Sequence, residues 1–123
     1  AIKRYSSTKK ILGICLGQQA IGEVFGGKLI NLDKVYHGVA TPIKIINEDL
    51  LFDDIPKTFD VARYHSWVVE TPLPNELIAT SFDDKGYLMS LRHKIYDVCG
   101  LQFHPESVLT PHGKKILSNW INS

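Results

Sequence analysis

Cys15 stands between two glycines in the segment Gly13-Ile14-Cys15-Leu16-Gly17, and this spacing could give its thiol a chemical role. In a nucleophile elbow, a sharp turn from strand to helix projects the central side chain, and small neighbours avoid a clash. The helix N-terminus would favour thiolate over thiol, and the backbone amide of Leu16 could donate to an oxyanion. From this segment alone, the alternative that Cys15 is a small buried hydrophobe stays open.

A base and an acid stand near the other end of the chain, in the segment Gln102-Phe103-His104-Pro105-Glu106. The residue before a proline favours extended backbone, where side chains two apart point the same way, so Glu106 can lie beside His104. Taken singly, His104 could be a structural histidine and Glu106 a solvated loop acid. A thiol nucleophile needs a base that takes its proton and an acid that fixes the tautomer of that base. Together with Cys15, these residues predict a catalytic triad.

The elements that must position these residues form a mixed pattern of strands and helices. Residues 1–10 read as the end of a helix and a loop. A short apolar strand over 11–15 precedes a helix, whose apolar face is predicted to comprise Ala20, Ile21, Val24 and Phe25. Short apolar or alternating runs then predict six strands, at 28–32, 41–46, 61–70, 77–83, 86–93 and 98–104.

A last helix is predicted near the C-terminus. Thr110 is expected to cap it with Pro111 at its first position. Helical spacing predicts a buried face of Ile116, Leu117, Trp120 and Ile121. No repeat or linker interrupts the 123 residues, which predicts a chain with one core.

Composition narrows the classes of partner and compartment. The chain has fourteen Lys and Arg residues and thirteen Asp and Glu residues, and its basic residues form no block. Neither nucleic acid nor a membrane is therefore an expected partner. The two cysteines, Cys15 and Cys99, suit neither a disulfide framework nor a metal pair. We therefore expect free thiols and a cytoplasmic location. Cys99 has no partner base and is predicted to be a buried, inert strand residue.

Four segments together resemble a known family. GICLGQQAIG (13–22), YHGV (36–39), RYHSW (63–67) and GLQFHPES (100–107) are similar to the conserved segments of the class I, or triad, glutamine amidotransferases. RYHSW favours the branch with the small glutaminase subunit, or component II, of anthranilate synthase or aminodeoxychorismate synthase. The resemblance implies an α/β fold, with a flavodoxin-like doubly wound sheet that is mostly parallel and has antiparallel additions.

The resemblance also implies roles for residues of the triad. Cys15 matches the nucleophile that takes the γ-glutamyl group of glutamine as a thioester and frees ammonia. His104 matches the base that later acts as acid, and Glu106 matches its orienting partner. Leu16 matches the residue that supplies one oxyanion amide.

Further positions match residues that hold the substrate glutamine. Gln19 matches a side chain that contacts it, and Ser66 and Trp67 match a segment whose backbone holds its α-groups. The side chain of Trp67 is itself expected to lie in the core. The stretch around residues 36–38 resembles a loop near the synthase subunit, and no metal or organic cofactor is expected.

The sequence also departs from the family pattern. Complete members begin earlier, with a first strand, a helix and a loop that supplies a second oxyanion amide. The first strand and helix are therefore expected to be missing, and residues 1–123 are read as the C-terminal two-thirds of a single amidotransferase domain. Val39 also stands where many relatives carry lysine, so contact with a partner is less well supported there.

Three functions are compatible with the sequence. The first is a glutaminase subunit that passes ammonia to a chorismate-utilising synthase subunit, for either anthranilate or aminodeoxychorismate. The second is a noncatalytic binding module of the same fold, favoured by the absence of the expected first loop. The third is a γ-glutamyl hydrolase that uses the same triad.

Overall fold

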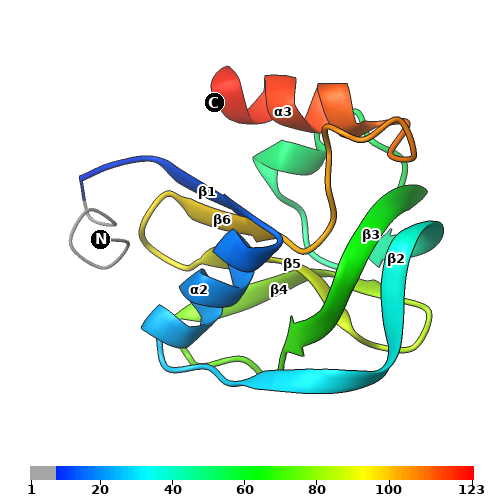
Figure 1. Ribbon diagram of the computed structural model, residues 1–123. Helices are drawn as coiled ribbons and strands as arrows, with labels where there is room; N and C mark the ends of the chain where they lie inside the picture. The colour runs from blue at the N-terminus through cyan, green and yellow to red at the C-terminus, as the bar shows by residue number, and fades with distance from the viewer. Residues whose placement is uncertain (1–7) are drawn as a thin grey trace.

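The computed structural model describes residues 8–123, with backbone alone at positions 33 and 34. Of the segment predicted as a helix end and loop, residues 1–7 lie outside the described part of the chain. One six-stranded sheet has the order β1-β6-β5-β4-β2-β3 (Figure 1). Its strands are β1 (Ile11–Ile14), β2 (Leu29–Ile45), β3 (Thr58–Val69), β4 (Leu77–Asp83), β5 (Leu88–His93) and β6 (Val98–Leu101).

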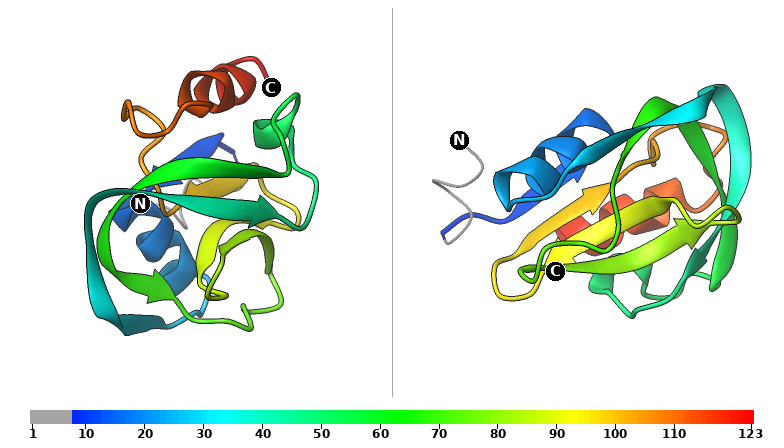
Figure 2. Two further views of the ribbon diagram at one scale, coloured as in Figure 1. Left: turned by 90° about the vertical axis from the view of Figure 1, so that its right-hand side faces the viewer. Right: turned by 90° about the horizontal axis from the view of Figure 1, so that it is seen from below.

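Helices cover the part of the sheet that contains β1 and β6. They are α2 (Leu16–Val24) and α3 (Gly113–Ile121), with a short 3-10 helix, η1 (Leu50–Phe52), beside α3. Figure 1 and the left panel of Figure 2 show α2 and α3 on opposite sides of β1 and β6. β1 pairs with β6 in parallel, and the other four described strand pairs are antiparallel. No helix among residues 8–123 is long and apolar enough to cross a membrane.

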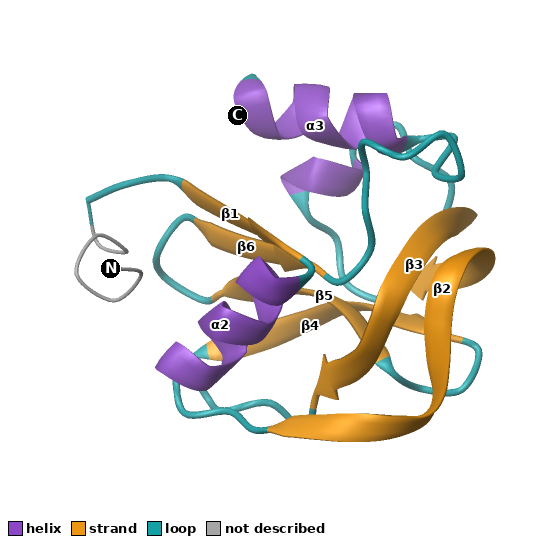
Figure 3. Ribbon diagram, in the orientation of Figure 1, coloured by secondary structure: helices purple, strands orange, loops and turns teal. Residues whose placement is uncertain are grey.

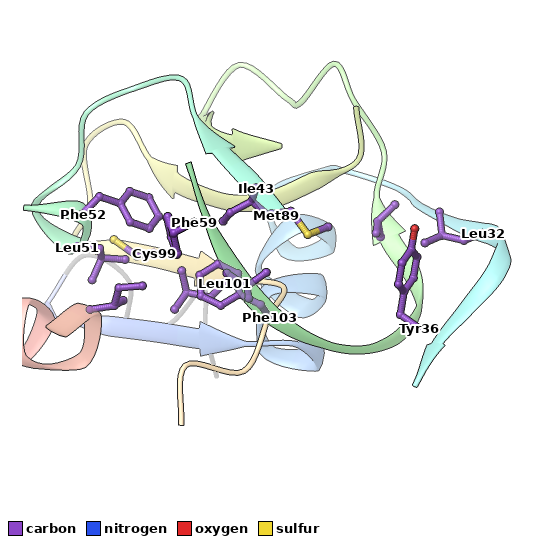
Figure 4. Close-up of a cluster of buried hydrophobic side chains, with 13 residues drawn as sticks. Leu32, Tyr36, Ile43, Leu51, Phe52, Phe59, Met89, Cys99, Leu101 and Phe103 are labelled. Carbon is purple, nitrogen blue, oxygen red and sulfur yellow. The ribbon is translucent and has the colours of Figure 1, made fainter. Parts of the chain in front are cut away.

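The two faces of the sheet carry two apolar clusters, because alternate strand side chains point to opposite faces. On β6, Val98 packs in the cluster that includes Ile21 of α2, while Cys99 and Leu101 pack in the cluster that includes Ile116 of α3. Figure 4 shows the second cluster, in which Phe59 lies close to Leu101 and Phe103. The rings of Phe59 and Phe103 meet edge to face, with centroids 6.2 Å apart. Phe103 is completely buried, so it anchors the segment that follows β6.

The predicted passage from strand to helix is present at β1 and α2, with a short turn between them (Figure 3). A Cβ on Gly13 would lie 2.6 Å from the backbone carbonyl of Gly17 and 2.7 Å from a methyl of Ile21. Only glycine therefore lets the strand and the helix approach so closely. A Cβ on Gly17 would meet nothing within 4 Å, so no described contact requires the second glycine.

The strands predicted at 28–32 and 41–46 are wrong as separate elements, because β2 contains all but the first residue of one and the last residue of the other. This 17-residue strand bends sharply (Figure 2), and its register with β3 shifts between Asn31 and Tyr36 and again between His37 and Val39. The intervening Gly38 has φ 71°, which a bulge can accommodate without ending the strand. The stretch 36–38, expected to be a loop, is thus an irregular part of a strand.

The last helix is present, but its predicted cap is wrong. α3 begins at Gly113 after His112, which makes no side-chain capping bond. The hydroxyl of Thr110 instead accepts from the backbone N–H of Ala62 at 2.8 Å and donates to the carbonyl of His104 at 2.8 Å. Within the predicted apolar face, Ile116 is fully buried but Ile121 is 67% exposed, so the expected burial of Ile121 is also wrong. This residue is the last one of α3.

Candidate active site

Cys15 is the single residue between β1 and α2, and its backbone conformation is unusual. Its φ of 55° and ψ of −103° lie in a region that residues with side chains rarely adopt. The backbone N–H of Cys15 donates to the carbonyl of Leu101 at 2.6 Å, and its carbonyl accepts from the N–H of Gln19 at 3.2 Å. These bonds hold the turn between the parallel strands and the first turn of the helix.

Cys15 lines a pocket of about 480 Å³, and most of the other predicted site residues line the same pocket. The walls come from the β1–α2 turn, from β3 and from the segment after β6. A larger cavity of about 550 Å³ lies beside η1 and contains none of the predicted site residues. The lining of the smaller pocket consists of Ile14, Cys15, Leu16, Gln19, Tyr64, His65, Ser66, Trp67 and His104.

His104 is held through both its ring and its backbone. Its Nδ1 lies 2.9 Å from Oε2 of Glu106, which is half-exposed and does not line the pocket. Its backbone N–H donates to the carbonyl of Ala62 at 3.0 Å, and its carbonyl accepts the Thr110 hydroxyl. The ring also meets Tyr64 edge to face at 5.1 Å. With Glu106 ionised, Nδ1 carries the proton and Nε2 is left as the basic nitrogen.

The residues predicted to hold substrate partly bind one another. The side-chain Nε2 of Gln19 donates to the carbonyl of Trp67 at 3.0 Å and to Oε1 of Gln102 at 3.3 Å. Ser66 lines the pocket beside them. The indole of Trp67 is 45% exposed, so the expectation that it lies in the core is wrong. Its place at the pocket leaves the ring on the surface.

The model of the class-I glutamine amidotransferase family matches residues 1–123. The chain belongs to this family. It is 41% identical over 98% of its length to anthranilate synthase component 2 from Lactococcus lactis, and 37% identical over 99% to aminodeoxychorismate synthase component 2 from Klebsiella aerogenes. This amidotransferase chain spans 62% and 65% of those two relatives.

A solved structure agrees with the family assignment. A Thermoplasma acidophilum protein described as belonging to a GMP synthase is 26% identical, with a TM-score of 0.88. The alignment covers 98% of this amidotransferase chain and 59% of the other. The predicted α/β fold of the class I glutamine amidotransferases is therefore confirmed. Among the described residues, the parallel part of this fold consists of the pair of strands β1 and β6.

The thiol of Cys15 in this amidotransferase chain is not activated by its position alone. Burial raises its pKa above the ordinary value, and the negative charge of Glu106 adds to that increase. The backbone amide of Leu16 and the side-chain amide of Gln102 lower the pKa, but by less. The predicted preference for thiolate at the helix N-terminus is thus outweighed by burial, and the thiol needs a base.

The second cysteine has a different environment. Cys99 on β6 is 2% exposed, and its burial as a strand residue is confirmed. This burial, with the charge of Asp49, raises the pKa of Cys99 to about 12. Cys99 is therefore a thiol at neutral pH and lies outside the pocket lining.

Beneath the pocket, a buried polar group joins β3 to β4, and sequence reasoning did not assign it to the site. Arg63 is completely buried and pairs with Asp83, with Nη1 2.8 Å from Oδ2. Its Nε donates to Nε2 of His65 at 3.0 Å, and its guanidinium lies 3.5 Å from the ring centroid of Tyr36. One sequence signal was available, because residues 63 and 65 share a face of the predicted strand.

The tautomer of His65 follows from these contacts. Its Nε2 accepts from Arg63, so its Nδ1 carries the proton and donates to the carbonyl of Trp67 at 3.1 Å. Burial, with the positive charge of Arg63, lowers the pKa of His65 to about 4. The imidazole is therefore neutral at physiological pH and helps to position the backbone of the pocket wall.

This shift predicts that acid destabilises the fold through His65. An unfolded histidine takes up a proton near pH 6.5, whereas the folded one resists until about pH 4. The free energy of unfolding should therefore fall by about 3 kcal/mol between those values, and the contribution is fully present above pH 6.5. Denaturant unfolding at several pH values measures this slope. His65→Asn should reduce it, while His37→Asn, at an exposed side chain, controls for the loss of a histidine.

Proposed function

We propose that this amidotransferase chain carries the glutaminase site of a chorismate-utilising synthase. The observation that carries the proposal is the pocket lined by both a strained, buried cysteine and a histidine that is paired with a carboxylate. His104 Nε2 takes the proton of the Cys15 thiol, and the thiolate attacks the side-chain amide carbon of glutamine. Glu106 stabilises the imidazolium that forms.

The later steps use the same groups. The tetrahedral intermediate places negative charge on the former amide oxygen, toward which the backbone N–H of Leu16 can donate. Collapse breaks the carbon–nitrogen bond as the imidazolium of His104 protonates the departing nitrogen, giving ammonia and a γ-glutamyl thioester. Water, deprotonated by His104, then attacks the thioester and releases glutamate while the thiol of Cys15 regains its proton.

Substrate positioning is proposed for Gln19, Ser66 and Trp67. Both protons of the Gln19 amide are used by acceptors of the protein, and no described hydrogen bond uses its Oε1. This oxygen can accept from the α-ammonium group of glutamine. Ser66 and Trp67 contribute backbone groups along one wall of the pocket.

The proposed partner is the chorismate-utilising subunit, component I, which would receive the ammonia. Support comes from relatives named as component 2 of anthranilate synthase and of aminodeoxychorismate synthase. Both kinds match, so the proposal covers amination of chorismate and neither single product. Within it, residues 1–123 form the C-terminal two-thirds of one domain. The cytoplasmic location and the lack of a metal or organic cofactor stay predictions.

The test compares two nitrogen sources in the complete protein with its synthase partner. We expect Cys15→Ser to reduce glutamine-dependent product formation at least about 10³-fold while synthesis from ammonium salts continues. Product formation from chorismate is measured by fluorescence or chromatography. A wild-type complex that uses only ammonium would support the noncatalytic module. Hydrolysis of γ-glutamyl peptides without transfer to chorismate would support the γ-glutamyl hydrolase.

A further inference from the structure

Gln102, which was not among the predicted site residues, lies beneath Cys15 and is completely buried. Its side-chain Nε2 is 3.6 Å from Sγ of Cys15, a separation that suits an N–H to sulfur hydrogen bond. Its Oε1 accepts from Gln19 at 3.3 Å, and its backbone N–H donates to the carbonyl of Met89 at 2.7 Å. The residue therefore touches the reacting sulfur and is fixed at both its backbone and its side chain.

The neighbours decide which end of the Gln102 amide faces the sulfur. The carbonyl of Trp67 can only accept, so Gln19 must present its NH₂ group there. The same NH₂ group also donates to Gln102, so the Gln102 atom that faces it must be the amide oxygen. The remaining end of the Gln102 amide, the NH₂ group, is thereby turned toward Cys15.

The carbonyl of Trp67 has a second donor, His65, which links it to the buried Arg63. His65 donates to the same carbonyl of Trp67, because Arg63 occupies its other nitrogen. Arg63 is in turn held by the carboxylate of Asp83. The series of bonds therefore connects a buried ion pair between β3 and β4 to the sulfur of Cys15, and its direction reverses at the carbonyl of Trp67, which accepts from both His65 and Gln19.

We propose that Gln102 is a further catalytic residue, whose amide N–H stabilises the thiolate of Cys15 when His104 removes the proton. The inference rests on the proposed glutaminase function. A hydrogen bond to a charged acceptor is stronger than one to a neutral acceptor, so the amide favours the thiolate over the thiol. The same amide opposes the increase that burial causes in the pKa of Cys15. No electron or atom is transferred to Gln102 in this role.

Gln18, on helix α2, offers a matched control for Gln102. Its side chain is also completely buried, but neither amide atom has a hydrogen-bond partner among the described residues. Its chain neighbour Gln19 belongs to the proposed site, whereas Gln18 packs against Gly100 of β6. Gln18→Met and Gln102→Met therefore make the same chemical change at the same burial, and only the second removes a donor from the sulfur.

The decisive measurement is the rate at which iodoacetamide alkylates Cys15 as a function of pH. The complete protein is used, and the Cys15 peptide is followed by mass spectrometry. We expect Gln102→Met to raise the apparent pKa of Cys15 by about one unit, which slows alkylation at neutral pH about tenfold. Gln18→Met should leave the profile unchanged. With glutamine, the Gln102 variant should lose kcat more than it changes KM.

Two outcomes overturn the inference. One is a Gln102→Met profile that coincides with the wild-type profile, and the other is an equal shift in Gln18→Met. If Gln102→Met does not fold, Gln102→Glu replaces it, because glutamate keeps the oxygen for Gln19 but places a carboxylate oxygen at the sulfur. The apparent pKa of Cys15 should then rise by more than it does in the methionine variant. Alkylation needs no glutamine turnover, so failure of the proposed glutaminase function shows separately, in wild-type protein that does not hydrolyse glutamine with its partner.

Discussion

Replacing His104 by alanine is expected to reduce glutamine-dependent synthesis at least about 10³-fold while ammonia-dependent synthesis by the partner survives. The base that takes the Cys15 proton is then missing, and burial keeps this thiol protonated. Free ammonia bypasses the step, because it reaches the synthase subunit without the thioester. The measurement is product formation from chorismate with glutamine or with ammonium chloride, using the complete enzyme.

Glu106→Gln is the matched, milder variant. The base remains, and the carboxylate that is removed is half-exposed, so water can take over part of its role. We expect a loss of about 10- to 100-fold with glutamine, since the imidazolium of His104 is less well stabilised. Loss of ammonia-dependent synthesis in either variant would indicate a folding defect. Equal losses in both variants with glutamine would contradict the roles given to the pair.

The second large effect is expected in covalent labelling. A diazo-ketone analogue of glutamine should label Cys15 at least about 10³ times faster than Cys99, because only the thiolate form reacts and only Cys15 lines the pocket. Burial holds the pKa of Cys99 near 12, so its thiolate is scarce at neutral pH.

Mass spectrometry of the two cysteine peptides gives both rates. Glutamine should protect Cys15, and the difference between the two cysteines should disappear in denaturant. Equal labelling of the native protein, or labelling of Cys15 that glutamine does not slow, would contradict a glutamine pocket at this turn.

Local sequence signals predicted the parts of the fold that local interactions determine. The apolar run before Cys15 and the helical spacing after it predicted β1 and α2. Glu106 lies beside His104 as predicted, but the extended backbone expected there is wrong, because Pro105 and Glu106 form a turn closed by the bond from the N–H of Ser107 to the carbonyl of His104. The bounds predicted for β4 agree with the structure because polar turns flank that strand on both sides. In each case the signal and the structure lie within a few residues of one another.

The features that were missed depend on residues far apart in the sequence. Thr110 looked like a helix cap, but its hydroxyl instead joins β3 to the backbone of His104. The ion pair between Arg63 and Asp83 requires knowledge of how β3 packs near β4. The stretch 36–38 was expected to be a loop, and only its pairing with β3 identifies it as a bulged part of β2.

The backbone of Cys15 sets reactivity against stability at one position. A residue with a side chain at its φ of 55° and ψ of −103° is strained by about 1 to 3 kcal/mol, a sizeable part of the 5 to 15 kcal/mol that holds a typical domain folded. Glycine would adopt the same turn without that strain. Selection for stability alone would therefore drive residue 15 toward glycine, and only the need for sulfur opposes it. Inactive descendants of this family are thus expected to gain stability first at the residue where they lose their chemistry.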